Sequence, residues 1–327
     1  MTMRTAPARF GTIDALRGVA AIAVMLFHAD GDTPIEMPGG YLAVDLFFAL
    51  SGFVIAHSYA SRLDKGMPFA TFMRLRAARL WPMLALGAIL GIVLHGGHAG
   101  MLFLLPNPNS PDMLYPANPP FWSLLLEMIG YTAFALLWGR IGARGLGTII
   151  AASAVTLVIA SLGGSKLLSF GAEWQGMVPG LARLAFAFGM GVAIWHLRKG
   201  ARDRQVTPFA WALPAIFLFA AWISGQTNPP GLIVIFLLVP ALTWFASHWE
   251  IPQSRIAAAL GDCSYPLYCI HVPLIASAQA AGAPVWTVLL ALPAFALWLD
   301  RAVDAPLRKL ARRALIRNPS PNRASAA

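Results

Sequence analysis

The residues in this sequence best suited to chemistry stand inside apolar stretches. Arg17 and His28 are eleven positions apart in one such stretch. On a helix they would differ by about 20° around the axis and lie about 16 Å apart along it. Ionisable side chains are costly within a bilayer, so those found there are functional candidates. We therefore expect one helix face to carry a guanidinium near one membrane surface and an imidazole toward the other.

Two carboxylates stand in other apolar stretches at a similar expected depth. Asp45 and Glu127 each lie a short way into a run that should enter the membrane from the outer side, and His28 should lie toward that same side. A carboxylate bonded to one imidazole nitrogen fixes the tautomer and leaves the other nitrogen to accept a proton. We predict that His28, Asp45 and Glu127 form a catalytic group. The alternative is a polar network that only holds helices together.

A cluster of arginines precedes Trp81 and Pro82. The planar guanidinium fork suits phosphate, and Arg76 and Arg79 share one face if the segment is helical. With Arg17, they predict a phosphate-binding surface. A positively charged loop that only sets topology is the competing interpretation. Further along, His271 follows Pro266 in an apolar stretch, and is either a second active-site residue or a packed polar contact.

Composition indicates the elements that must position these side chains. Hydrophobic residues make up 58% of the 327 positions and charged residues 12%, against about 25% charged in soluble proteins. We therefore predict an all-α polytopic membrane bundle of about ten transmembrane helices. The expected spans are 13–29, 40–60, 81–98, 120–139, 146–163, 178–197, 208–224, 229–248, 259–281 and 284–301.

Charge sets the expected topology. The net charge is +10, and basic residues between apolar runs set orientation and attract anionic lipid, so nucleic acid is not an expected partner. With the N-terminus inside, 22 of the 24 Lys and Arg residues fall on the cytoplasmic side, the exceptions being Lys166 and Arg183. Both termini are therefore expected in the cytoplasm. We expect one membrane domain over 1–307 and a basic, disordered tail over 308–327. No cluster of metal ligands stands out, so no metal is expected.

Six stretches, in order, carry a resemblance to a known family. They are Arg17 through His28, Gly40 through Phe53, Arg76 through Pro82, Trp122 through Glu127, Leu260 through His271, and Asp304 through Arg308. Together they resemble the membrane acyltransferase 3 family of bacterial carbohydrate O-acyltransferases. The sequence departs from that pattern at Gly130-Tyr131, where the family often has an aromatic pair, and at Asp304, where Glu is common.

The resemblance implies an enzyme of the inner (plasma) membrane that crosses it several times. It implies an acyl-CoA donor in the cytoplasm, by default acetyl-CoA, and a carbohydrate hydroxyl as acceptor on the outer face. Arg17, Arg76 and Arg79 would hold the CoA phosphates. His28, oriented by Asp45 or Glu127, would act as general base or carry the acyl group itself. The further substrate-site candidates are Trp122, Ser123, Tyr265 and His271.

Two other functions compete with this one. A transporter would use His28, Asp45 and Glu127 as a proton relay and would need no acyl donor. A structural subunit of a polysaccharide export complex would tolerate alanine at His28 and Glu127. The arginine cluster favours the enzyme, because a proton relay needs no phosphate site. Carbohydrate and membrane lipid are the expected partners, and the sequence gives no indication of oligomeric state.

Overall fold

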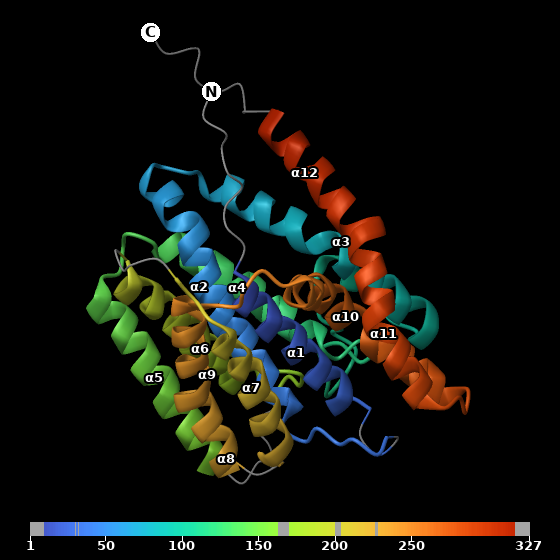
Figure 1. The fold of residues 1–327 in the computed structure, drawn as a ribbon. Helices are drawn as coiled ribbons and strands as arrows, with labels where there is room; N and C mark the ends of the chain where they lie inside the picture. Colours follow the sequence, from blue (N-terminus) through green and yellow to red (C-terminus); the bar gives the residue numbers. More distant parts are fainter. Residues whose placement is uncertain are drawn as a thin grey trace.

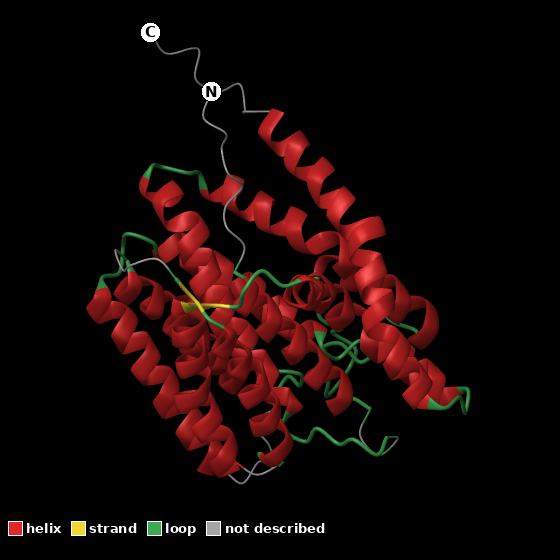
Figure 2. Ribbon diagram, viewed as in Figure 1, coloured by secondary structure: helices red, strands yellow, loops and turns green. Residues whose placement is uncertain are grey.

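The computed structural model describes residues 10–29, 31, 33–162, 170–199, 204–225 and 228–317, and they form a helical bundle (Figures 1 and 2). The two short strands, β1 (Gln205–Val206) and β2 (Trp249–Glu250), pair in parallel. The α-helices are α1 (Gly11–Phe27), α2 (Ala43–Asp64), α3 (Phe69–His95), α4 (Phe121–Leu137), α5 (Ala143–Leu162), α6 (Met177–Arg198), α7 (Ala212–Ile223), α8 (Asn228–Ile233), α9 (Val239–His248), α10 (Arg255–Ala280), α11 (Val285–Leu299) and α12 (Ala305–Arg317). Short 3-10 turns are η1 (Gly40–Leu42), η2 (Ala99–Phe103) and η3 (Pro208–Trp211), and π-helical turns are η4 (Val234–Leu238) and η5 (Asp300–Asp304).

The all-α prediction is confirmed, and each of the ten predicted ranges overlaps a helical segment. Within the described part of the chain, six helical segments are long and apolar enough to cross a bilayer. The chain is therefore a multi-pass membrane protein. The six segments are Gly40–Asp64, Phe69–His95, Ala143–Leu162, Met177–Arg198, Pro230–His248 and Val285–Ala314.

Two boundaries differ from the sequence prediction. The helix expected from residue 81 begins at Phe69, so the arginine cluster is part of α3 rather than of a loop before it. The tail expected to be disordered from residue 308 is helical as far as Arg317, because 308–317 continue α12. Helix α12 packs against α3 (Figure 1). Lys166 and residues 318–327 lie outside the described residues.

Helix α1 lies inside the bundle and packs closely against α10. A Cβ atom on Gly18 would come within 2.4 Å of the Leu260 side chain, so only glycine permits this approach. Helix α10 contains two prolines, and one of them, Pro273, has no N–H to donate to the carbonyl of Cys269. Asn118 Nδ2 donates to that carbonyl at 2.9 Å, which satisfies the buried acceptor and joins the segment before α4 to α10.

Helices α2 and α6 also approach through small residues. A Cβ on Gly52 would lie 2.2 Å from the Phe188 carbonyl oxygen, and one on Gly191 would lie 2.0 Å from that of Ala49. Small residues allow membrane helices to pack backbone against backbone. This contact determines where the polar side chains of α2 and α6 meet.

Candidate active site

A cavity of about 190 Å³ lies among α1, α2, α3, α4 and α10. All three predicted phosphate-binding arginines line it, together with Glu127. With the substrate-site candidates Ser123 and Tyr265, six predicted site residues from four distant parts of the sequence surround one space. The other polar residues of its wall are Ser51, Ser123, Tyr131, Ser264, Tyr265 and Tyr268.

The positive charge in this cavity is only partly compensated. Among the described residues, no ion pair joins Arg17 or Arg76 to a carboxylate, and Arg76 Nε is buried without a hydrogen-bond partner. The Arg76 guanidinium instead lies over the Tyr131 ring, 5.0 Å from its centre. Uncompensated guanidinium groups at a cavity wall are suited to bind an anionic ligand.

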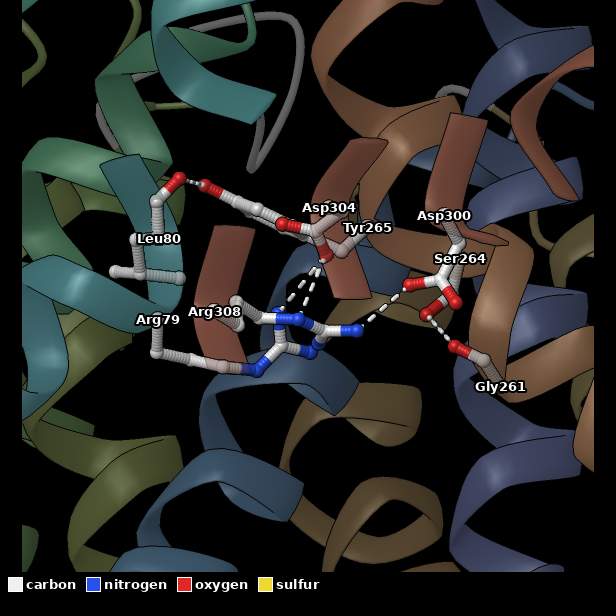
Figure 3. A network of polar contacts seen from close by, with 8 residues as sticks. All are labelled: Arg79, Leu80, Gly261, Ser264, Tyr265, Asp300, Asp304 and Arg308. Carbon is white, nitrogen blue, oxygen red and sulfur yellow. Dashed lines mark hydrogen bonds and ion pairs between the residues drawn. The ribbon is translucent and has the colours of Figure 1, made fainter. Parts of the chain in front are cut away.

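Arg79 is held in place by an acidic pair at the end of α11. Its Nη1 lies 3.4 Å from Asp304 Oδ2, while Arg308 bonds Asp304 at 3.2 Å and Asp300 at 2.8 Å (Figure 3). The π-helical turn η5 carries both aspartates, and both are buried. Tyr265 donates to the Leu80 carbonyl at 2.6 Å, and the Arg79 guanidinium lies over its ring.

Glu127 accepts hydrogen bonds from two hydroxyls. Ser51 Oγ donates at 2.8 Å, and the Tyr131 hydroxyl donates to the same oxygen. Both donors also line the cavity. Two donors to one carboxylate oxygen fix the orientation of the Glu127 side chain beside the three arginines. Neither Ser51 nor Tyr131 was among the residues predicted from sequence.

His28 lies outside the cavity lining and contacts His271 instead. The Nδ1 atom of His28 is 3.2 Å from Nε2 of His271, and the two ring centres are 5.0 Å apart. Tyr268 connects this pair to the cavity: it lines the wall, its hydroxyl bonds Ser123, and its ring centre is 5.9 Å from that of His271. The structure thus brings two predicted histidines together.

Asp45 does not make the contact expected of it. Both of its carboxylate oxygens bond Arg183, at 3.1 Å to Nε and 2.6 Å to Nη2, and both side chains are completely buried. Arg183 also donates to the carbonyls of Tyr41 and Phe170. Among the described residues, His28 therefore makes no hydrogen bond to Asp45 or to Glu127. His28, Asp45 and Glu127 do not form the connected group that the sequence predicted.

The remaining substrate-site candidates differ in position. Ser123 and Tyr265 line the cavity. Trp122 does not line the cavity and is 7% exposed. The Arg183 guanidinium lies over its ring, with Cζ 5.5 Å from the ring centre. A Cβ on Gly171 would lie 2.2 Å from the ring. The structure shows Trp122 as a packed support of the Asp45–Arg183 pair.

Sequence reasoning missed several of these partners, although some carried a signal. Arg183 stands alone in an apolar run, which requires a buried partner, but nothing in the sequence selects Asp45. Tyr131 is four residues after Glu127, which places both on one helix face. Ser51 and Tyr268 carried no comparable signal, because hydroxyl residues are common in membrane helices.

Comparison with known proteins identifies one family model and several relatives. A family model described as an acyltransferase domain (Acyl_transf_3) matches residues 10–299. Protein 2 in the picA locus of Rhizobium radiobacter is 31% identical over 187 residues, covering 47% of this chain and 96% of that protein. Acyltransferase MdmB of Streptomyces mycarofaciens is 27% identical, covering 82% of this chain and 79% of that protein.

A third relative is longer. The peptidoglycan O-acetyltransferase OatA of Listeria monocytogenes is 24% identical over 91% of this chain, which corresponds to 56% of that protein. No solved structure gives a significant match. The family match covers nearly the whole chain, including the helices that form the cavity. The chain therefore belongs to the acyltransferase 3 family and is an acyltransferase that transfers groups other than amino-acyl groups.

Proposed function

We propose that this protein transfers an acyl group, by default acetyl, from cytoplasmic acyl-CoA to a hydroxyl of a cell-envelope or extracellular carbohydrate. In this proposal ten helices cross the inner membrane and both termini lie in the cytoplasm. The observation that carries the proposal is the cavity in which Arg17, Arg76 and Arg79 face one carboxylate, Glu127. A proton relay has no need of three guanidinium groups.

The donor is assigned to the arginine side of the cavity. Its phosphates would meet Arg17 and Arg76, which have no carboxylate partner in the described structure, and Arg79, which Asp304 orients. Phosphate accepts two parallel hydrogen bonds from a guanidinium, and this geometry holds the acyl thioester in one orientation. The positive-inside pattern supports a cytoplasmic position for this group, since α3 begins in the most basic stretch between two spans.

The transfer step is assigned to His28. As general base, it would take the proton of the sugar hydroxyl while that oxygen attacks the thioester carbonyl. The carbon–sulfur bond then breaks, and the CoA thiolate leaves and takes up a proton. The second route has the His28 imidazole attack the thioester first and pass the acyl group to the sugar. In both routes the acyl end of the donor must move from the cavity past Tyr268, which contacts both sites.

Relatives support a carbohydrate as acceptor. OatA is named as an acetyltransferase of peptidoglycan. The exopolysaccharide production protein ExoZ of Rhizobium meliloti is 26% identical over 79% of this chain. The carbohydrate that this chain acylates would reach His28 from the outer face, where α1 ends.

The proposal is tested with purified protein in lipid nanodiscs supplied with labelled acetyl-CoA and a glycan. We expect glycan-dependent CoA release and label on the glycan. Arg76→Gln should raise KM for acetyl-CoA about tenfold or more, since a charge-assisted hydrogen bond contributes about 1.5–3 kcal/mol. Arg74→Gln is the matched control, because Arg74 is exposed on the same helix.

His28→Ala should abolish transfer while the protein still inserts and folds. Normal acylation by this variant would remove His28 from the mechanism. Proton flux without any acyl donor, together with no CoA release, would instead identify a transporter.

A further inference from the structure

The His28 and His271 rings contact each other in a way that determines where their protons lie. His28 ends α1, and its Nδ1 is 2.9 Å from the Val24 carbonyl oxygen and 3.2 Å from His271 Nε2. His271 is completely buried within α10. Its Nδ1 is 3.0 Å from the carbonyl oxygens of both Leu267 and Tyr268.

The proton of His271 follows from these distances. A carbonyl oxygen can only accept, so the Nδ1 atom that faces two of them must carry the hydrogen. A neutral imidazole has one N–H, so Nε2 of His271 is an acceptor. A second proton would place a charge on a fully buried ring with no carboxylate bonded to it among the described residues, which is costly.

The proton of His28 follows in turn. Its Nδ1 faces two acceptors, the Val24 carbonyl and His271 Nε2, so Nδ1 carries the hydrogen. The lone pair of the His28 ring is then on Nε2. We infer that His271 is a positioning residue that holds His28 in the tautomer whose Nε2 can accept a proton.

This inference rests on the proposed role of His28 in acyl transfer. Imidazole alone in water mixes its two tautomers, and only the one with a free Nε2 directs its lone pair away from the α1 backbone. In many enzymes a carboxylate makes this selection. Here Asp45 is committed to Arg183 and Glu127 to Ser51 and Tyr131. Here a second imidazole, itself oriented by the backbone of α10, acts together with the Val24 carbonyl as acceptor.

Kinetics of two variants at one position test the inference. His271→Phe keeps an aromatic ring and removes one of the two acceptors that face His28 Nδ1. The other acceptor, the Val24 carbonyl, already accepts the His28 backbone N–H at 3.1 Å, so it should hold the tautomer only in part. We expect kcat to fall about tenfold, the upper end of what one neutral hydrogen bond contributes. KM for acetyl-CoA should not change, because His271 does not line the arginine cavity. His271→Gln can place an amide oxygen near the position of Nε2 and should recover most of kcat. His95→Gln is the matched control, because His95 also bonds α10, through the Pro273 carbonyl at 2.9 Å.

A spectroscopic measurement tests the same inference without activity. Nitrogen NMR of 15N-histidine-labelled protein, with His28→Asn used to assign the signal, should show an unprotonated His28 Nε2 in the wild type. In His271→Phe the same signal should move part of the way toward the average of the two tautomers, because only the shared Val24 carbonyl remains as acceptor.

A protonated Nε2 on His28 in the wild type would overturn the inference. So would a loss of kcat in His271→Phe no larger than that in His95→Gln. If the wild-type protein transfers no acyl group, the proposed function fails, and the nitrogen spectrum still decides the tautomer.

Discussion

Arg183 and Asp45 form a two-pronged ion pair between α6 and α2 with neither side chain exposed to solvent. The pair is satisfied on all sides, since Arg183 also donates to two backbone carbonyls. It accounts for the one Arg within a predicted span that the sequence left without a partner. Because Asp45 is paired with Arg183, it does not make the contact with His28 that the sequence predicted.

Neutralising one member of this pair should destabilise the fold. Asp45→Asn leaves a buried guanidinium without its counter-charge, which costs about 3–5 kcal/mol. Thermal unfolding in detergent measures this loss. The double variant Asp45→Asn with Arg183→Gln should lose less than the sum of the two single variants, because it leaves no unpaired charge. A stable Asp45→Asn protein that had lost only transfer activity would contradict the structural role.

The close packing of α2 against α6 at two glycines leads to a second prediction. Gly52→Ala or Gly191→Ala adds a Cβ within about 2 Å of a backbone oxygen and should separate α2 from α6, destabilising the protein by about 1–3 kcal/mol. Gly147→Ala on α5 is the matched control: its Cβ meets nothing within 4 Å, and alanine should be neutral or stabilising there. Equal melting temperatures for all three variants would contradict the close packing.

The hydroxyls around Glu127 should act as one unit. Glu127→Gln replaces the one carboxylate that lines the arginine cavity, and we expect kcat to fall at least 100-fold. Ser51→Ala and Tyr131→Phe each remove one donor and should have smaller, non-additive effects, measured by a double-mutant cycle. Thr132→Val is the control, because its hydroxyl bonds the Met128 carbonyl rather than Glu127. Additive effects would show that the two hydroxyls act separately.

Two substitutions of Tyr265 distinguish the role of its ring in the cavity wall from any role of its hydroxyl in catalysis. Its hydroxyl is occupied by the Leu80 carbonyl, so Tyr265→Phe should cost about 1 kcal/mol of stability and leave kcat unchanged. Tyr265→Ala also removes the ring beneath Arg79 and should raise KM for acetyl-CoA. A large fall in kcat in the phenylalanine variant would assign the hydroxyl a part in transfer.

Much of this protein could be predicted from local sequence patterns. The ten apolar runs correspond to helical segments because a backbone in hydrocarbon must satisfy its own hydrogen bonds. Helical periodicity predicted that Arg76 and Arg79 share a face, and both line the cavity. The extension of α3 to Phe69 and of α12 to Arg317 was missed, since charged helical segments outside an apolar run carry no span signal.

The sequence by itself determined the membrane class, the helical segments and the types of residue available for chemistry, because these depend on neighbours along the chain. Only the tertiary structure decided the partners: Asp45 with Arg183, Glu127 with Ser51 and Tyr131, and His28 with His271. Each of these contacts joins two different helices, except that Tyr131 is on the same helix as Glu127. Its geometry depends on how closely the helices approach and how each is rotated. Those quantities come from packing at glycines such as Gly18 and Gly191, which expected depth along a span does not specify.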